Sequence, residues 1–344
     1  MDTLRVGIIG YGRIGAEHAE WLSSACNARA TAVADATPAR RELASRRGLR
    51  VYEDVDALLR DDSIDAVLVA SPTAMHFEHA SRAIQAGKHL MVEKPMALDL
   101  PQSRALRDQA RSRNRVLSVF HNRRWDVDYL TVRDAIVSGA FGQLINIESR
   151  LGQFSSCVGP AAAEYRPNWR NEASFGGGGL YDWGSHFVDQ MWRILLPAKP
   201  VRVFAQLRAN VWSQDCDDFA RVLIDFDSGV AALVEINTTT TAPLPRWQID
   251  GTLGSASSPA SLTFDSRVWA DLRFTPANGE SRTFPVAANG LSERQIWESF
   301  AAAVFGKGEP AVPIDTVLVT MALLDAARES GKTGKAIEVP DKTY

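Results

Sequence analysis

The segment Val6–Gly15 reads VGIIGYGRIG and joins a short apolar run to glycines at positions 10, 12 and 15. The apolar run predicts a buried strand, and the residues from Ile14 onward predict a helix. Gly10 permits the tight turn between them, Gly12 lets a bound group approach the backbone, and Gly15 lets the helix pack closely on the strand. This G-x-G-x-x-G spacing predicts a strand–turn–helix unit whose free backbone N–H groups suit a bound anion.

A carboxylate follows at the distance that a dinucleotide site requires. Asp35 ends the next apolar run, twenty positions after Gly15. In a dinucleotide-binding fold an acid at this place binds the adenosine ribose hydroxyls. The alternative is a tight turn that binds no ligand. Because a carboxylate repels a ribose 2′-phosphate, Asp35 favours NAD, and NADP stays open because Arg40 and Arg41 follow within about one helical turn.

The first 121 residues alternate apolar runs with helical patterns, which predicts an α/β domain with a Rossmann-type, doubly wound parallel sheet. The expected strands cover residues 4–10, 30–35, 66–71, 89–93 and 116–120, and the helices between them start near Ala16, Thr37, His79 and Leu100.

Residues 122–344 predict a second, α+β domain that binds substrate and makes oligomer contacts. The expected strands are longer and alternate in polarity, at 144–151, 201–212, 218–226 and 230–238, and the expected helices cover 126–138, 180–195, 293–305 and 314–329. Asp227-Ser228-Gly229 is a hairpin signal, so the large sheet should be mostly antiparallel. The Ser/Ala/Pro/Gly-rich segment 254–261 predicts a flexible loop.

Composition excludes several partner classes. The chain has 344 residues, 45% of them hydrophobic and 23% charged, with a net charge of -3 and scattered basic residues, so nucleic acid is not an expected partner. No segment approaches the roughly 20 apolar residues of a membrane span. Cys26, Cys157 and Cys216 lack metal-ligand or disulfide spacing, which indicates a cytoplasmic protein without a metal site. We expect a homodimer or homotetramer formed through the broad second-domain sheet, where the pattern predicts that Val203, Leu207 and Val211 are exposed.

Lys94 stands in HLMVEKPMAL, directly beyond a predicted central strand. The carboxyl edge of such a sheet is where α/β folds bind ligands. Pro95 restricts Lys94 to an extended conformation, which gives its side chain a fixed direction. The alternative is a surface lysine followed by a proline that ends the strand.

The predicted helix 180–195 carries Asp182, His186 and Asp189 at i, i+4 and i+7, on one face. An imidazole titrates at about pH 6.5, so His186 suits a general base. The alternative is a solvated polar face with an ion pair between Asp189 and Arg193.

Taken together, these motifs resemble the Gfo/Idh/MocA family of nicotinamide-dependent sugar and polyol oxidoreductases. The resemblance spans both predicted domains. It rests on GIIGYGRIG at 7–15, SPTAMH at 71–76, EKP at 93–95 and FGGGGLYDWGSHFVDQ at 175–190, while RRWD at 123–126 is similar to the branch that contains inositol-type dehydrogenases.

The resemblance implies that Lys94, Asp182 and His186 are catalytic. Hydride would pass between NAD, or NADP, and a hydroxyl-bearing carbon of a sugar or cyclitol, a small-molecule substrate. We expect Lys94 to hold the substrate oxygen and His186 to take its proton. We expect Asp182, one turn before His186, to orient the substrate and tune that imidazole. The chain departs from the family at Thr73, where asparagine is usual, and at Ser71, where threonine is usual.

The remaining predicted contacts divide between cofactor and substrate. The expected cofactor contacts are Gly10, Tyr11, Gly12, Arg13, Ile14, Asp35, Arg40, Ser71, Pro72, His76 and Glu93. The expected substrate contacts are Arg124, Trp125, Tyr165, Trp169 and Asp189. The family resemblance leaves two alternatives open: a glycosidase that oxidises and re-reduces its sugar with bound NAD, and a non-catalytic sugar or dinucleotide sensor.

Overall fold

A computed structural model describes residues 3–157 and 169–340 of the chain. These residues form two compact units that alternate along the sequence. The first unit contains the described residues within 1–122, 158–176 and 291–321, and the second contains those within 123–157, 177–290 and 322–344. The boundary expected at residue 121 divides the chain once, whereas later segments return to the first unit.

The first unit contains a six-stranded parallel sheet in the order β3-β2-β1-β4-β5-β6. The strands are β1 (Leu4–Ile9), β2 (Ala28–Ala34), β3 (Arg50–Tyr52), β4 (Ala66–Val69), β5 (His89–Val92) and β6 (Leu117–Val119). The direction of strand order reverses between β1 and β4, which is where such sheets open a crevice for ligands. The predicted doubly wound sheet is confirmed, and β3 escaped prediction because it is short and largely exposed.

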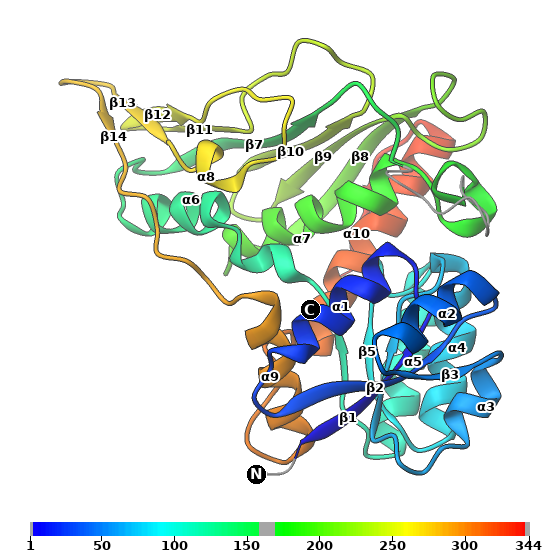
Figure 1. The fold of residues 1–344 in the computed structure, drawn as a ribbon. Helices are drawn as coiled ribbons and strands as arrows, with labels where there is room; N and C mark the ends of the chain where they lie inside the picture. The colour runs from blue at the N-terminus through cyan, green and yellow to red at the C-terminus, as the bar shows by residue number, and fades with distance from the viewer. Residues whose placement is uncertain (1–2, 158–168, 341–344) are drawn as a thin grey trace. The chain divides into compact units, whose positions relative to one another are not determined.

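Helices follow most of these strands. They are α1 (Arg13–Ser23), α2 (Pro38–Arg46), α3 (Val55–Leu59), η1 (Thr73–Met75), α4 (His76–Gln85) and α5 (Leu100–Ser112), joined later in the chain by η3 (Trp169–Asn171), η4 (Ala173–Phe175) and α9 (Glu293–Val304). Helix α9 packs against α1 (Figure 1). A capping box formed by Ser292 and Gln295 starts α9 at the predicted residue.

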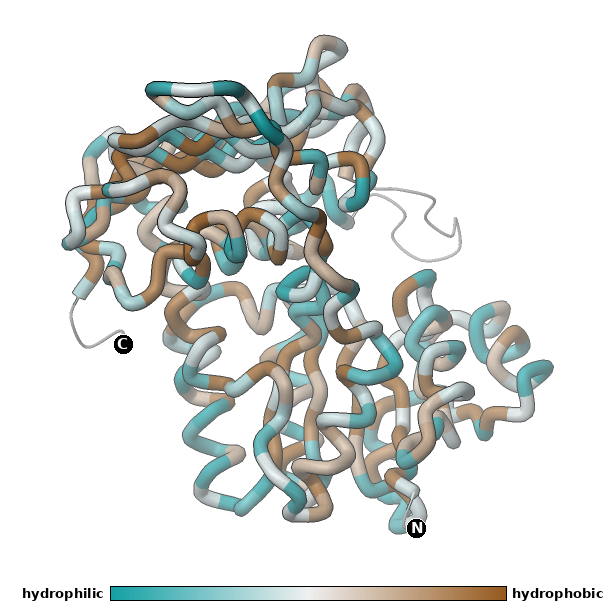
Figure 2. Tube along the Cα trace, turned by 90° about the vertical axis from the view of Figure 1, so that its left-hand side faces the viewer, coloured by the Kyte–Doolittle hydropathy of each residue, from teal (hydrophilic) through white to brown (hydrophobic). Residues whose placement is uncertain are grey.

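The core of this unit lies along its central strands. Every residue of β4 is buried, as are Leu90, Met91 and Val92 of β5. Apolar residues follow the strands, and hydrophilic residues gather on helices and loops at the surface (Figure 2). Burial on both faces explains why these strands read as continuous apolar runs.

The second unit contains a nine-stranded sheet in the order β14-β13-β12-β11-β7-β10-β9-β8-β15. The strands are β7 (Leu144–Gly152), β8 (Pro200–Arg208), β9 (Phe219–Phe226), β10 (Ala231–Asn237), β11 (Trp247–Gly251), β12 (Gly254–Ser257), β13 (Arg273–Pro276), β14 (Arg282–Thr283) and β15 (Ile337–Glu338). Among the described strands β7 and β10 pair in parallel and the other neighbours are antiparallel, as predicted. The segment expected to be a flexible loop instead supplies β12, whose backbone pairs on both sides.

Helices cover one face of this sheet, among them α6 and α7 (Figure 1). The unit contains α6 (Val127–Val137), η5 (Leu180–Gly184), α7 (Ser185–Ile194), α8 (Ser266–Trp269) and the second part of α10 (Ile314–Thr333), and η2 (Asn122–Trp125) leads into it. The sequence predicts one helix over 180–195, but its first turn, η5, is a π-helical turn.

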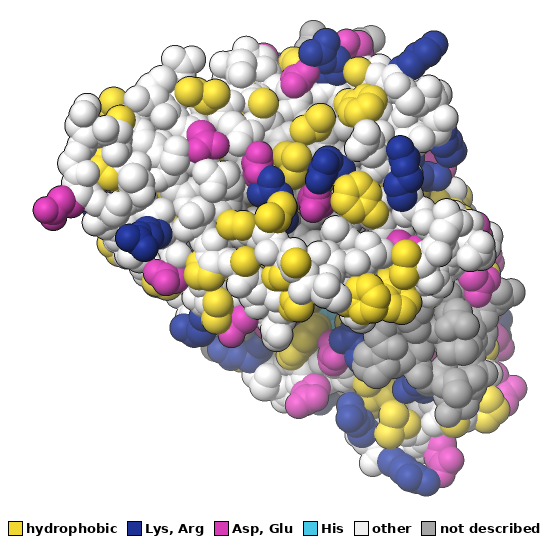
Figure 3. All heavy atoms as spheres, turned by 90° about the horizontal axis from the view of Figure 1, so that it is seen from above, with side chains coloured by type: hydrophobic (Ala, Val, Ile, Leu, Met, Phe, Trp, Pro, Cys, Tyr) yellow, Lys and Arg dark blue, Asp and Glu magenta, His cyan; other side chains and the backbone are white. Residues whose placement is uncertain are grey.

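The side chains exposed on this sheet differ in part from those that the sequence predicts. Val203 is fully buried, and Leu207 packs beside Gly331 of α10. Val211, beyond the end of β8, is exposed as expected. The alternation along β9 instead turns Leu223 outward, with 41% of its surface exposed. Apolar and charged side chains of both signs share the surface seen in Figure 3. In the described part of the chain, no helix has the combined length and apolar character to cross a bilayer.

Candidate active site

A cavity of about 400 Å³ opens at the carboxyl ends of β1, β2 and β4, within the first unit. Its wall includes Gly10, Gly12, Arg13, Ile14, Asp35, Thr37, Arg40, Ser71, Pro72, His79, Arg82, Trp169 and Arg170. Eight of the eleven predicted cofactor contacts are therefore among the residues that line one cavity. It lies at the reversal of strand order, where the chain connections diverge and leave space at the sheet edge.

The three glycines of the first loop have different physical roles. Gly10 has a φ of +90°, and a Cβ there would lie 2.8 Å from the carbonyl oxygen of Ala70. A Cβ on Gly15 would lie 2.1 Å from the carbonyl oxygen of Gly10. A Cβ on Gly12 would meet no described atom within 4 Å. Packing therefore requires glycine at positions 10 and 15, whereas Gly12 keeps space open beside the backbone.

The N-terminus of α1 faces this open space with its backbone groups available. Gly12 is the N-cap residue, and among the described residues no side chain caps this end and no acid occupies its first turn. The first N–H groups of a helix lack intrahelical partners and carry partial positive charge. The loop thus fits the pyrophosphate of a dinucleotide, which needs close approach and N–H donors.

Asp35 stands at the end of β2 with its carboxylate held in place. Its Oδ2 accepts a hydrogen bond from the Tyr11 N–H at 2.6 Å, and its Oδ1 accepts one from the Thr37 N–H at 2.8 Å. Arg40 and Arg41, the two arginines that could favour NADP as the cofactor, have different contacts. Arg40 lines the cavity, while Arg41 donates to the carbonyl oxygens of Asp35 and Ala36. Tyr11 does not line the cavity, which differs from the cofactor contact expected for it: its side chain is fully buried, and its backbone N–H donates to Asp35.

The first turn of α4, which follows β4 and its loop, contains two histidines with different positions. His76 is 1% exposed, and its Nδ1 and Nε2 lie 2.9 and 2.8 Å from the carbonyl oxygens of Pro95 and Ser71. It joins the two loops behind the cavity wall, which differs from the direct cofactor contact that the sequence suggests. His79 lines the cavity and lies 2.9 Å from the Ser71 Oγ. Burial lowers the pKa of His79 to about 4, so this wall carries no imidazolium charge near neutral pH.

Glu93 and Lys94 follow β5, the neighbour of β4 in the sheet. Glu93 does not line the cavity: its Oε1 lies 2.7 Å from the His18 Nε2, and its Oε2 accepts a hydrogen bond from the Lys94 N–H at 3.1 Å. Burial acts to raise the pKa of Glu93, but His18 and Lys94 outweigh it and lower that pKa. Glu93 is therefore a largely buried carboxylate, 12% exposed, that accepts a hydrogen bond from the backbone of Lys94.

In the second unit, Asp182 lies within η5 and His186 lies in the first turn of α7. Asp217 holds the entry to this helix: its Oδ2 accepts from the Leu180 N–H at 2.7 Å, and its carbonyl oxygen accepts from the Gly179 N–H at 2.8 Å. A Cβ on Gly178 would lie 2.3 Å from the Asp217 Oδ1, so glycine is needed here. Burial raises the pKa of Asp217 to about 7.

The predicted substrate contacts Arg124 and Asp189 pair with each other. Their two bonds measure 2.8 Å from Nε to Oδ2 and 2.7 Å from Nη2 to Oδ1, and the side chains are 2% and 1% exposed. This two-point pair ties η2 to α7, which differs from the hydroxyl-binding role expected for each residue. Trp125 is half-buried beside Gly290, and Tyr165 lies outside the described residues.

Trp169 belongs to the first unit and lines the same cavity as the predicted cofactor contacts, although the sequence suggests that it contacts substrate. The Arg170 guanidinium carbon lies 4.4 Å from the centre of the Trp169 ring. The pair extends the cavity wall with an aromatic ring and a cation.

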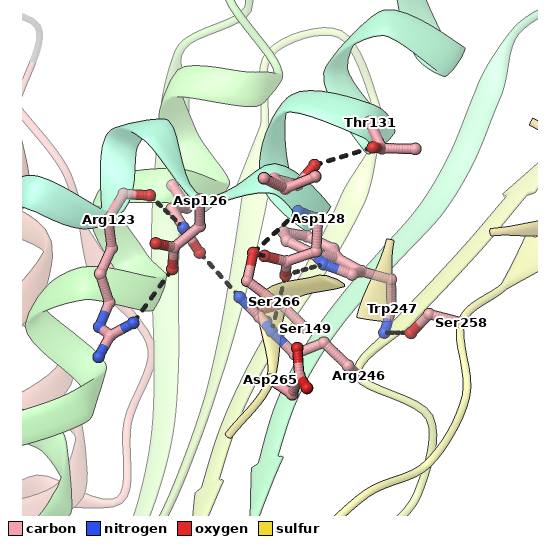
Figure 4. Close-up of polar contacts among 12 residues, drawn as sticks. Arg123, Asp126, Asp128, Thr131, Ser149, Arg246, Trp247, Ser258, Asp265 and Ser266 are labelled. Carbon is pink, nitrogen blue, oxygen red and sulfur yellow. Dashed lines mark hydrogen bonds and ion pairs between the residues drawn. The ribbon is translucent and has the colours of Figure 1, made fainter. Parts of the chain in front are cut away.

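A buried polar cluster fixes α7 from its other side (Figure 4). Arg246 donates to the Gln190 Oε1 of α7 at 2.8 Å and to the Ser149 Oγ of β7, and it pairs with Asp128 of α6 at 3.4 Å. Trp247 donates its indole N–H to Asp128 at 2.7 Å. Burial lowers the pKa of Arg246 to about 10. The cluster holds the backbone that presents His186.

Sequence comparison places this geometry in a family. Residues 4–121 match the GFO/IDH/MocA model described as "Oxidoreductase family, NAD-binding Rossmann fold", and residues 129–257 match the GFO/IDH/MocA C-terminal domain. The chain belongs to the Gfo/Idh/MocA oxidoreductase family. The expected NAD-binding Rossmann domain is thereby confirmed.

Two relatives and a solved structure show how this Gfo/Idh/MocA chain relates to known proteins. Inositol 2-dehydrogenase of Rhizobium meliloti is 30% identical over 98% of this chain and 99% of the relative. The scyllo-inositol 2-dehydrogenase (NADP(+)) IolW of Bacillus subtilis is 29% identical over 73% of this chain and 67% of the relative. The crystal structure of an NAD-binding protein from Listeria innocua has a TM-score of 0.87 at 29% identity, covering 98% of this chain and 97% of that one.

Sequence reasoning missed several residues of the Gfo/Idh/MocA site. His79, Arg82 and Arg170 line the cavity, and His18 contacts Glu93. His79 lies three positions after His76 on the same helix, which is a local signal for a shared face. His18 carries no such signal, because its partners Glu93 and Trp297 are distant in sequence.

Proposed function

We propose that this Gfo/Idh/MocA oxidoreductase transfers a hydride between a nicotinamide cofactor and a hydroxyl-bearing carbon of a sugar or cyclitol. The observation that carries the proposal is the cavity in which Gly12 keeps the backbone open and Asp35 stands at the adjoining strand end. A carboxylate in this position suits the ribose diol, so NAD is the proposed cofactor, with NADP accommodated through Arg40. The inositol dehydrogenases among the relatives support a cyclitol or sugar substrate.

The proposed chemistry divides between three side chains. The nicotinamide, when bound, accepts or donates the hydride. Lys94 binds the substrate oxygen and stabilises the negative charge that develops on it. His186 removes the hydroxyl proton during oxidation, and Asp182 orients that imidazole. Two hydrogen bonds support these roles. Glu93 fixes the Lys94 backbone, and Asp217 fixes the turn that carries Asp182.

A screen of sugars and inositols with NAD and NADP, followed by absorbance of the reduced nicotinamide, tests the proposal. We expect reduced cofactor to accumulate with at least one free polyol or sugar. Cleavage of a glycoside without such accumulation would instead indicate a redox-assisted glycosidase. Binding of ligand with no turnover of any kind would indicate a sensor.

Replacement of Lys94 provides the matching test of mechanism. Lys94→Ala should lower kcat about 100- to 1000-fold, the usual effect of losing one group that stabilises an oxyanion. NAD affinity should change little, because Lys94 is not in the cavity wall. Lys307→Ala, at an exposed position of the same unit, is the control. Equal activity in both variants would contradict the proposed role.

We also propose that the open face of the second-unit sheet forms a homo-oligomer. Leu223 is exposed on this face, and Arg221 pairs there with Glu235 of the adjacent strand. A mixed apolar and charged surface suits a symmetric contact, in which each patch meets its own copy. Light scattering should show a dimer or tetramer that Leu223→Asp weakens, and a monomeric wild type would exclude this oligomer.

The thiols of Cys26, Cys157 and Cys216 suit a reducing compartment, and we propose that the protein is located in the cytoplasm.

A further inference from the structure

A chain of hydrogen bonds runs from α9 through α1 to the backbone of Lys94. The Trp297 indole N–H donates to the His18 Nδ1 at 2.9 Å, and the His18 Nε2 lies 2.7 Å from the Glu93 Oε1. The other carboxylate oxygen of Glu93 accepts the Lys94 N–H at 3.1 Å. All four residues belong to the first unit.

The donors and acceptors in this chain fix the tautomer of His18. An indole nitrogen only donates hydrogen bonds, so the His18 Nδ1 must accept and carry no proton. The remaining proton of a neutral imidazole is then on Nε2, which donates to Glu93. The donor and the acceptor of every bond in the chain are thereby fixed. The chain ends at the Glu93 carboxylate, which accepts the hydrogen bond from the Lys94 N–H.

The surroundings of His18 exclude water and hold the ring still. The His18 side chain is 0% exposed, and its ring lies 4.8 Å from Trp21, 4.3 Å from Phe120 and 5.6 Å from Trp297, centre to centre. A hydrogen bond to a charged group is strong in such an environment, and losing one partner leaves a costly unpaired carboxylate. His18 also belongs to α1, the helix whose N-terminus faces the dinucleotide cavity.

We propose that His18, with its tautomer set by Trp297, is a positioning residue that orients Glu93 and thereby fixes Lys94 for hydride transfer. This inference rests on the proposed function, in which Lys94 holds the substrate oxygen. His18 is not among the residues that line the cavity, and it acts through Glu93. It joins the cofactor-binding helix and the lysine loop into one rigid assembly.

Three variants separate this role from simple packing. His18→Leu fills the same space with an apolar side chain of similar size and removes the donor to Glu93. His18→Gln restores an amide N–H that reaches Glu93. Trp297→Phe keeps a ring at position 297 and removes only the donor to His18, so it serves if the leucine variant fails to fold. Ser118→Ala is the control, because it removes a different buried hydrogen bond in the same unit, to the Val312 carbonyl oxygen.

The expected result is a loss of kcat rather than of cofactor binding. His18→Leu should lower kcat about 10- to 100-fold, as small misplacements of a catalytic group do, while NAD affinity stays close to that of the wild type. His18→Gln should recover most of the loss, and Trp297→Phe should show a smaller loss. Ser118→Ala should retain the wild-type kcat.

Amide hydrogen exchange at Lys94, measured by NMR, gives a readout that does not depend on activity. His18→Leu should speed that exchange roughly tenfold, since the bond to a fixed charged acceptor is weakened. Unchanged exchange at Lys94, or a control that loses as much kcat as His18→Leu, would overturn the inference. If the wild type turns over no sugar or polyol, the proposed function fails, and the exchange measurement still decides whether His18 positions Lys94.

Discussion

Gly15 lies so close to Gly10 that a Cβ on residue 15 would be 2.1 Å from the Gly10 carbonyl oxygen. Real contacts never approach so closely, so the helix must shift if residue 15 has a side chain. Gly12, three positions earlier, faces open space. The same loop therefore contains two glycines that packing requires, Gly10 and Gly15, and a third, Gly12, that leaves space beside the backbone.

Gly15→Ala and Gly12→Ala should separate these two needs. Gly15→Ala should lower the free energy of unfolding by about 1–3 kcal/mol, because overpacking strains the backbone. Gly12→Ala should change that free energy by less than about 0.5 kcal/mol, yet weaken NAD binding. Urea denaturation and a fluorescence titration with NAD measure the two effects. Wild-type NAD affinity in Gly12→Ala would contradict a pyrophosphate at this loop.

Asp35 and Arg40 should decide between NAD and NADP. Asp35→Ser removes the charge that repels a 2′-phosphate and leaves Arg40 in the cavity wall. We expect NAD affinity to fall about tenfold, the effect of roughly 1.4 kcal/mol, and the NADP to NAD preference to rise. Adding Arg40→Ala should reverse the gain for NADP. Dissociation constants for both cofactors in the single and double variants test this, and a gain that survives without Arg40 would rule out its role.

The ion pair between Arg124 and Asp189 should behave as a structural element. Arg124→Leu leaves the Asp189 carboxylate buried without this partner, which should cost about 3–5 kcal/mol of unfolding free energy. The double variant Arg124→Leu/Asp189→Leu should recover much of this loss, because neither charge of the pair then stays buried. Urea denaturation of the single and double variants checks the prediction. A double variant as unstable as the sum of its parts would argue against the pairing.

Asp217 should make stability depend on pH. Burial raises its pKa to about 7 in the folded protein from an ordinary value of 3.8, so the folded state holds a proton that the unfolded state releases. The resulting stability is full below pH 3.8 and is lost as the pH rises through 7.

The wild type should therefore unfold more easily at pH 8 than at pH 5, and Asp217→Asn should reduce this difference. Some dependence will remain, because burial also raises the pKa of Asp126 to about 7. Unfolding free energies at both pH values provide the measurement. The opposite slope would show that Asp217 is ionised in the folded state.

The parts of this molecule that sequence reasoning anticipated are those set by local patterns. Buried parallel strands leave uninterrupted apolar runs, and the first loop has the spacing that its turn and helix packing demand. The π turn at Leu180–Gly184 and the strand at Gly254–Ser257 could not be read, because each depends on distant partners. Asp217 holds the first, and pairing on both sides forms the second.

Contacts between residues distant in sequence also explain where the predicted site differs from the structure. Arg124 and Asp189 are separated by 65 positions, so their charges looked available to a ligand when each satisfies the other. Trp169 was expected to contact substrate because an aromatic ring suits the C–H surface of a sugar, yet its segment belongs to the first unit and lines the cavity there.

Trp297 lies 279 positions after His18, the residue to which it donates. A ribosome making this protein therefore releases the whole parallel sheet long before α9 is available to cover α1. Until then the nascent chain exposes the apolar surface that α9 later buries, a state in which chaperones bind and aggregation begins. We therefore expect truncation after the parallel sheet to impair folding during synthesis more than it lowers the stability of the finished fold.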